Sequence, residues 1–395
     1  MSSTGAVALR RTASAVAVTG TVAGAALGIG WHYSSVLLDP RSRTGFPERV
    51  LATTVGSVVL SRSRLCAQPG VWGLRWDGRP GGGPSGGTSG GLAVLGPVLE
   101  QDRDRVVRRR LDGPRPPVGP AVIDAGPFDP DPGARGLAFT EVVVDTPLGP
   151  APAWDVPPPN GARGRGRGGV WAIHVHGRGG SRREALRILP ALHGLGLHQL
   201  VISYRNDGNA PQGPDGRYHL GDTEWEDLDA AVGYALDRGA EKVVLVAWSM
   251  GAAVSGAFLD RSPRASQVAA VVWDAPLLDW RATLRRQAAN RYLPPPLAGL
   301  ASRFTSRRIG IDFDRFDLAR RPPAVRPPTL LVHSDADSAV PASVSRALAA
   351  AAPGLDWPVR YLEVAGVEHT GSWNADPQAY ENAVSGFLRE TLGPA

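Results

Sequence analysis

The chain has 395 residues, of which 43% are hydrophobic, which suffices for one large domain with a smaller one or an insertion. The formal net charge is +6, carried almost entirely by arginine, with Lys242 as the only lysine. No basic helix concentrates this charge, so we expect no nucleic-acid partner. Cys66 is the only cysteine, which excludes an intramolecular disulfide.

The first predicted element is an uncharged run of small and apolar residues from Ala13 to Trp31, which follows Arg10 and Arg11. About eighteen such residues are enough to cross a bilayer, and flanking arginines stay on the cytoplasmic side. We therefore expect residues 1–34 to be a single-pass membrane anchor that places the rest of the chain outside the cytoplasm. A cleaved signal peptide is the alternative, because its arrangement of charged and apolar residues is similar.

Residues 35–137 are predicted to form a small β-rich subdomain. Short strand-like runs alternate there with Gly and Pro, a pattern typical of antiparallel sheets; the runs are Val55–Leu60, Val71–Trp76, Leu92–Glu100 and Arg105–Leu111. The stretch Arg79–Gly91 has too few apolar side chains to pack and is expected to be a loop. Pro157–Gly169 contains RGRG, and between two strands we interpret it as a solvated loop rather than an RNA-binding tract.

Residues 138–395 show a different pattern, in which apolar strand-like runs alternate with helical segments. The runs are Phe139–Thr146, Pro152–Val156, Val170–Gly177, Leu200–Tyr204, Val243–Trp248, Val268–Trp273, Thr329–Ser334 and Val359–Val364. Near-continuous apolar strands separated by helices indicate a mostly parallel sheet with both faces covered. The predicted fold class is therefore α/β, with a doubly wound sheet.

Residues 247–251 read Ala-Trp-Ser-Met-Gly and lie where an apolar strand passes into a helix. A serine in such a sharp turn presents its Oγ above the carboxyl edge of the sheet, where ligands of this fold class bind. The positions two before and two after the serine require small residues, here Ala247, where glycine is commoner, and Gly251. We interpret this turn as a nucleophile elbow, with Ser249 as the nucleophile. The alternative is a serine that only caps the helix.

A serine nucleophile needs a base, and the base needs a carboxylate that orients it. The expected chain order for this fold is serine, acid, histidine. His369 follows the last predicted strand and is the candidate base, and Asp337 is the candidate acid. Asp335 is the second choice, two residues closer to its strand, and Asp274 is a third; a turn or capping role is the alternative for each.

The negative oxygen of an acyl-transfer intermediate requires backbone donors. One is expected from the N–H of Met250, next to the serine, and the other from the loop after the strand that ends near His176. We assign the second donor to the N–H of Arg178. Gly177 lets the backbone approach a substrate closely, and His176 is a candidate substrate contact whose position fits a role in bracing the loop better.

Residues 138–395 resemble the α/β-hydrolase superfamily through the motifs HGRGGSR, AWSMG, DADSAVP and GVEH. The likeness is to membrane-anchored bacterial serine hydrolases related to the prolyl-oligopeptidase and dienelactone-hydrolase branches, and it implies a Ser249–His369–Asp337 triad. In this family an insertion such as residues 277–326 resembles a helical cap over the active site. Trp280 and Tyr292 in this insertion are candidates to line an apolar pocket; packing of the cap onto the core is the alternative.

The leading functional hypothesis is a serine hydrolase that cleaves carboxylic esters or thioesters through an acyl-enzyme, acting on a small-molecule or lipid-like substrate. A peptidase or amidase with the same triad is one alternative, and a non-catalytic binding protein of the same fold is another. No cofactor or metal is expected. His174 and His176 alternate in direction along a strand and have no accompanying carboxylate cluster, so a metal-dependent hydrolase is disfavoured.

Overall fold

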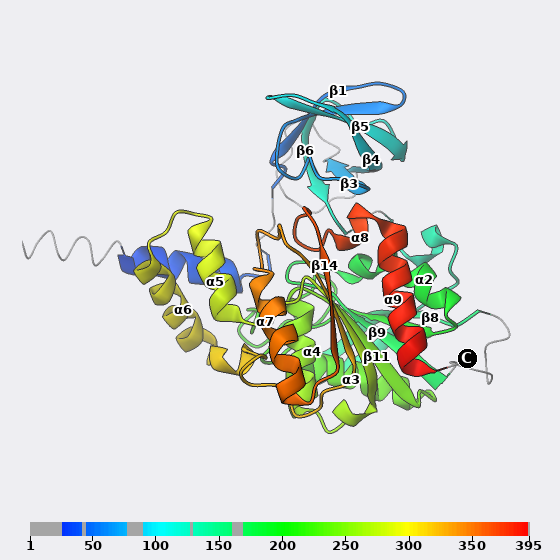
Figure 1. Cartoon of the computed structure of the whole chain (residues 1–395), viewed down its shortest axis with the longest axis vertical. Helices are drawn as coiled ribbons and strands as arrows, with labels where there is room; N and C mark the ends of the chain where they lie inside the picture. The colour runs from blue at the N-terminus through cyan, green and yellow to red at the C-terminus, as the bar shows by residue number, and fades with distance from the viewer. Residues whose placement is uncertain (1–25, 42–44, 77–89, 127–128, 160–168, 394–395) are drawn as a thin grey trace, which may run out of the picture.

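The computed structural model describes residues 26–41, 45–76, 90–126, 129–159 and 169–393. Most of the predicted membrane run and most of both predicted Gly-rich loops therefore lie outside the described residues. In the described parts, a small β-barrel stands above a large sheet that has helices on both faces, as Figure 1 shows. A third group of helices projects to one side of the sheet.

Six antiparallel strands close the barrel in the order β1-β2-β5-β4-β3-β6. Their bounds are β1 (Glu48–Thr53), β2 (Ser57–Ser61), β3 (Trp72–Trp76), β4 (Gly91–Gln101), β5 (Arg105–Asp112) and β6 (Gly119–Asp124). In β2 the burial alternates along the strand, which is the period expected when one face points into a barrel. The sequence runs anticipated β2 to β5, whereas β1 and β6, which close the barrel, were not recognised.

A buried arginine interrupts the apolar core of the barrel. The side chain of Arg108 on β5 is fully buried and donates to four backbone carbonyls, those of Gly96, Cys66, Gln68 and Gly70. Burial lowers the pKa of Arg108 to about 10, so the guanidinium is still charged at neutral pH. The planar, multi-donor guanidinium thereby fixes the loop between β2 and β3 onto the barrel.

The second sheet has eight strands in the order β14-β13-β12-β11-β9-β10-β8-β7. Its strands are β7 (Thr140–Thr146), β8 (Gly149–Val156), β9 (Val170–Val175), β10 (His198–Ile202), β11 (Lys242–Trp248), β12 (Val268–Asp274), β13 (Thr329–Ser334) and β14 (Val359–Val364). Strands β9 to β14 pair in parallel, and β8 and β7 are antiparallel at one edge. The predicted, mostly parallel sheet is confirmed.

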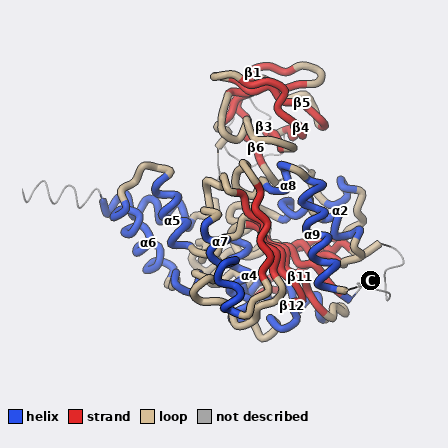
Figure 2. Tube along the Cα trace, in the orientation of Figure 1, coloured by secondary structure: helices blue, strands red, loops and turns tan. Residues whose placement is uncertain are grey.

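Helices cover both faces of this sheet (Figure 2). One face carries α3 (Trp225–Leu236), α4 (Met250–Arg261) and α7 (Ser343–Ala351), and the other carries α2 (Leu189–Gly194) and α9 (Pro377–Leu392). The central strand β11 is buried from Val243 onward and sends alternate side chains to the two sides, with Leu245 in one core and Val246 in the other. This two-sided burial explains its continuous apolar sequence.

Two long helices lie in the segment that was expected to form a cap, α5 (Trp280–Ala289) and α6 (Pro295–Ile309). A helix formed by residues 26–38 packs against them, as Figure 1 shows. A Cβ added to Gly30 would lie 3.1 Å from side-chain atoms of Leu300 and Phe304, so the helix backbone approaches α6 closely. The domain boundary expected at residue 34 lies inside this helix. Ser34 is buried against α6, where its hydroxyl accepts a hydrogen bond from Thr305.

Among the described residues, no helix combines the length and apolar character that crossing a membrane requires. Residues 13–25 of the predicted anchor lie outside the described part of the chain.

Candidate active site

Ser249 occupies a strained turn between β11 and α4, with φ 51° and ψ −116°. This backbone conformation is rare for a residue with a side chain and persists only where the surroundings enforce it. The N–H of Ser249 donates to the carbonyl of Asp274, and its carbonyl accepts from the N–H of Leu277, each at 3.0 Å. A Cβ added to Gly251 would lie 2.3 Å from the carbonyl oxygen of Val175, so this position accepts only glycine.

Three side chains from separate loops form one hydrogen-bonded chain. The Oγ of Ser249 lies 2.8 Å from Nε2 of His369, and Nδ1 of His369 lies 2.6 Å from Oδ2 of Asp337. The loops that carry them follow β11, β13 and β14, whose carboxyl ends meet at one edge because the strands are parallel. The structure thus brings the three sequence-predicted residues together in the geometry of a nucleophile, a base and an orienting acid.

Asp337 and His369 shift each other's pKa values. Burial alone would lower the pKa of His369, but the Asp337 carboxylate and its hydrogen bond outweigh burial and raise that pKa above its ordinary value. Burial alone would raise the pKa of Asp337, whereas the His369 and His333 rings together hold it well below its usual range. Asp337 is therefore ionised at neutral pH and stabilises the imidazolium form of His369.

The two other candidate acids have different partners. Asp335 accepts the backbone N–H of Gly366 at 2.7 Å and belongs to the turn after β13. Asp274 is buried, accepts the hydroxyl of Ser372 at 3.1 Å, and has its pKa raised by burial. The carboxylate that reaches His369 is therefore that of Asp337.

A second histidine also holds Asp337. His333 is fully buried, and its Nε2 lies 3.1 Å from Oδ2 of Asp337 while its Nδ1 lies 2.7 Å from Oγ of Ser345. The other carboxylate oxygen accepts the backbone N–H groups of Ala339 and Val340. His333 was not among the candidate site residues; its spacing of four from Asp337 at a strand end was the available signal.

The loop after β9 lies against the elbow, and His176 braces it from inside. His176 is buried, with Nε2 2.7 Å from Oδ2 of Asp207 and Nδ1 2.9 Å from the carbonyl of Gly177, and its ring stacks on Tyr204. It does not line the cavity described below, so its candidacy as a substrate contact is wrong: the pairing with Asp207 turns the ring into the core. A Cβ added to Gly177 would lie 3.0 Å from Cβ of Ser249, which explains the glycine.

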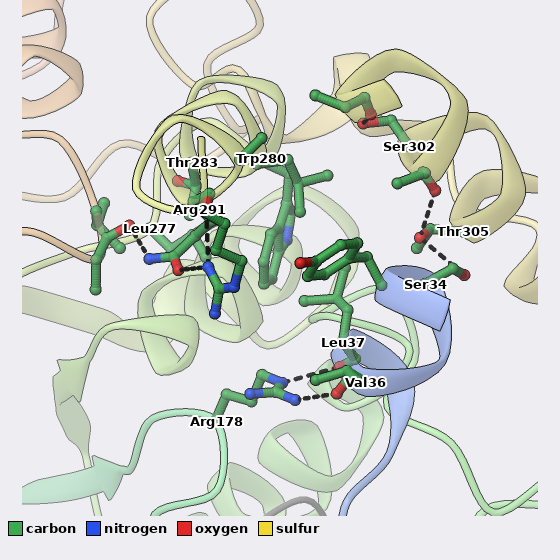
Figure 3. A pocket seen from close by; sticks show the side chains of 18 of the residues that line it. Ser34, Val36, Leu37, Arg178, Leu277, Trp280, Thr283, Arg291, Ser302 and Thr305 are labelled. Carbon is green, nitrogen blue, oxygen red and sulfur yellow. Dashed lines mark hydrogen bonds between the residues drawn. The ribbon is translucent and has the colours of Figure 1, made fainter. Parts of the chain in front are cut away.

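Arg178 and Met250, the two expected oxyanion donors, both line the cavity beside Ser249 and His369. Met250 is the first residue of α4, so its N–H has no intrahelical acceptor. The side chain of Arg178 bonds to the helix of residues 26–38: Nε donates to the carbonyl of Leu37 at 2.9 Å and Nη2 to that of Val36 at 2.6 Å, as Figure 3 shows.

A cavity of about 290 Å³ opens above Ser249. It lies between the sheet edge, α5, α6 and the helix of residues 26–38, and Trp280 lines it as expected. Tyr292 does not line it and is 95% exposed, so this prediction is wrong. Tyr292 takes a left-handed conformation, with φ 55°, just after the end of α5, and its neighbour Leu293 lines the cavity instead.

The barrel contacts the loops that carry the acid and the base. Oε1 of Gln68 accepts the backbone N–H of Glu368 at 2.8 Å. Arg64 forms an ion pair with the Glu368 carboxylate and donates to the carbonyl of Ala336 at 2.6 Å. Glu368 in turn accepts the hydroxyl of Ser338 at 2.8 Å. Sequence reasoning missed these residues, because contacts across about 300 positions leave no local pattern.

Comparison with known families divides the chain in the same way. Residues 213–395 match the Prolyl oligopeptidase family, and residues 49–123, which make up most of the barrel, match a domain of unknown function (DUF8805). Uncharacterized protein Rv2307c of Mycobacterium tuberculosis (strain H37Rv) is 30% identical over 235 residues, covering 57% of this chain and 72% of the relative.

Two solved structures share the fold. The esterase Pf2001 of Pyrococcus furiosus superposes with a TM-score of 0.53 at 18% identity, covering 68% of this chain and 98% of the esterase. A puromycin-hydrolyzing peptidase of Mycobacterium tuberculosis superposes with a TM-score of 0.50 at 19% identity, covering 78% of this chain and 53% of the peptidase. At these identities the likeness establishes the architecture only.

Proposed function

We propose that this chain, which belongs to the α/β-hydrolase superfamily, cleaves carboxylic esters or thioesters through an acyl-enzyme on Ser249. The observation that carries the proposal is the continuous hydrogen-bonded chain from Ser249 through His369 to Asp337. The Ser249 end of this chain lines the cavity. A catalytically silent protein of the same fold has no need for a strained serine with an oriented base.

The first half of the reaction forms the acyl-enzyme. Ser249 Oγ attacks the acyl carbon while His369 Nε2 takes the hydroxyl proton, and the backbone N–H groups of Arg178 and Met250 stabilise the negative oxygen. The bond from the acyl carbon to the leaving oxygen or sulfur then breaks. His369 gives its proton to that leaving group, which departs as an alcohol or a thiol, while Asp337 keeps the imidazolium oriented.

The second half releases the acid. A water molecule attacks the acyl carbon of the acyl-enzyme, and His369 takes one of its protons. When the bond to Ser249 Oγ breaks, His369 returns that proton to the serine. The products are a carboxylic acid and the free enzyme.

A peptidase or amidase activity with the same residues is the second candidate, and the match of residues 213–395 to the Prolyl oligopeptidase family favours it. The cavity supports the ester proposal more strongly. Peptide recognition relies on backbone hydrogen bonds along an edge strand or groove, whereas aliphatic and aromatic side chains such as Leu37, Trp280 and Leu284 line this cavity.

Active-site labelling tests the proposal. A small fluorophosphonate is expected to modify Ser249, with the adduct located by peptide mass, because a phosphonate takes the place of the acyl group at an activated serine. Nitrophenyl esters and the matching nitroanilides then distinguish the two candidates by kcat/KM. Absence of both labelling and turnover in folded protein would move the non-catalytic alternative to first place.

We further propose that residues 13–31 contribute to a membrane anchor, with the catalytic part outside the cytoplasm. The support is the uncharged run behind Arg10 and Arg11, together with the exposed apolar side chains of Leu27 and Trp31 near the start of the described chain. Fractionation of cells that express the full chain tests this, with a variant lacking residues 2–25 as the control. Recovery of both proteins in the same fraction would contradict the anchor.

A further inference from the structure

The helix of residues 26–38 supplies a wall of the active-site cavity. Its last turns contribute Tyr33, Val36 and Leu37 to the lining, opposite residues of α5 and α6. We infer that this wall forms an acyl-binding site, so that the substrate is an ester or thioester of an aliphatic acid longer than acetate. The inference rests on the proposed hydrolase function and deepens it by naming the substrate class.

Four polar side chains of this lining are turned to partners in the protein. The hydroxyl groups of Thr283 and Ser302 donate to backbone carbonyls one helical turn earlier, and the Gln287 amide donates to the carbonyl of Ala339. Thr305 bonds to the carbonyl of Ala301 and to the hydroxyl of Ser34. With these donors occupied, the lining presents mainly carbon atoms to a ligand.

The two cations at the cavity are also engaged. Arg178 donates to the carbonyls of Val36 and Leu37, and Arg291 donates to the carbonyl and the amide oxygen of Gln287. A charged or strongly polar acyl group would have to break these bonds or remain unpaired in an apolar space, which is costly. An aliphatic chain needs neither, and gains from leaving water.

The wall is joined to the loop that supplies an oxyanion donor. The carbonyls of Val36 and Leu37 belong to the last turn of their helix, where they lack intrahelical partners and a cation is favourable. Arg178 binds both, and its own backbone N–H is the proposed donor. The carbonyl of Leu38 accepts from the N–H of Tyr218, whose hydroxyl accepts from Gly179. These hydrogen bonds therefore hold the helix of residues 26–38, the proposed acyl wall, against the loop that carries Arg178 and Gly179.

The test compares nitrophenyl acetate, butyrate and octanoate as substrates of the full chain. We expect kcat/KM to rise by up to about fourfold for each methylene that becomes buried. Leu37→Trp, which narrows the cavity, should lower the octanoate-to-acetate ratio by about tenfold. His32→Trp places the same ring on an exposed position of the same helix, outside the lining, and should leave the ratio unchanged.

Ala301→Phe narrows the same space from α6 and gives a second reading if Leu37→Trp does not fold. Fluorophosphonate labelling of Ser249 in each variant reports whether the site is assembled. Equal ratios in Leu37→Trp and His32→Trp, or a wild-type preference for acetate, would overturn the acyl wall while the hydrolase proposal stands. Absence of labelling and of turnover with every ester in the wild-type protein would instead overturn the proposed function.

Discussion

Gln68 of the barrel accepts the backbone N–H of Glu368 at 2.8 Å, one residue before the proposed base His369. The neighbouring Arg64 pairs with the Glu368 side chain and reaches the carbonyl of Ala336, one residue before Asp337. The barrel thus contacts both loops on which the base and the acid are carried. We expect it to position these loops, and none of its described residues lines the cavity.

Gln68→Ala is therefore expected to lower kcat by about fivefold to tenfold with little change in KM, because loss of one buried hydrogen bond of about 1 kcal/mol loosens the histidine loop. Steady-state kinetics with a nitrophenyl ester measures the effect. Gln101→Ala, at an exposed end of β4, is the matched control and should behave as the wild type. An equal kcat for both variants would show that the barrel contact does not position His369.

Ser249→Ala should fold normally and lose turnover by a factor of about 10³ or more, since the three residues act as a unit. The measurement is kcat/KM together with circular dichroism for the fold. Ser266→Ala changes an exposed serine of the same domain and serves as the control. Unchanged turnover in Ser249→Ala would remove the acyl-enzyme mechanism.

Asp337→Asn and Asp335→Asn form a matched pair in one turn. The first substitution replaces the carboxylate that holds Nδ1 of His369 and is expected to lower kcat by about 10⁴-fold. The second replaces a carboxylate that accepts only a turn N–H from Gly366, and kcat should stay within about twofold of the wild type. A larger loss in Asp335→Asn would reassign the acid.

The acidic limb of the pH profile should reflect the charges around His369. The base acts only in its neutral form, and Asp337, with Glu184 and Asp274 farther off, raises its pKa. Activity is therefore fully present above this raised pKa and is lost as the pH falls through it, with an apparent pKa above the ordinary value of about 6.5. In Asp337→Asn the limb of kcat/KM should move to lower pH; a limb that stays in place would contradict the assignment.

Arg108→Met tests the charged centre of the barrel. The substitution keeps much of the apolar stem but leaves four carbonyls, among them that of Gln68, without their donor, which we expect to cost about 3 kcal/mol of unfolding free energy. Denaturant unfolding measures this cost. Arg109→Met, on the exposed side of β5, is the control. Equal stability of the two variants would show that the buried guanidinium is dispensable.

Local patterns in the sequence predicted the architecture and the elbow. Buried parallel strands have to be apolar along their whole length, as Val243–Trp248 is, and a strained serine turn requires small neighbours such as Gly251. The order of Ser249, Asp337 and His369 is the one expected for this fold, and each residue follows a parallel strand whose carboxyl end lies at the same edge of the sheet. Such features depend on neighbouring residues and on chain order, and can therefore be predicted from the sequence alone.

Tertiary structure decided what depends on distant contacts. Asp335 and Asp337 lie in one turn, and only the packing of His333 and the β14 loop selects the carboxylate that meets His369. Tyr292 has an aromatic side chain of the kind that lines apolar pockets, yet a left-handed turn after α5 directs it into solvent.

The residues that contact the site from the most distant parts of the sequence could not be predicted from it either. The helix of residues 26–38 carries the end of an expected anchor, but its packing on α6 makes it a wall of the cavity. Gln68 reaches the histidine loop from 300 positions away. Contacts at such separations follow from how whole domains pack, and no periodicity in the sequence records them.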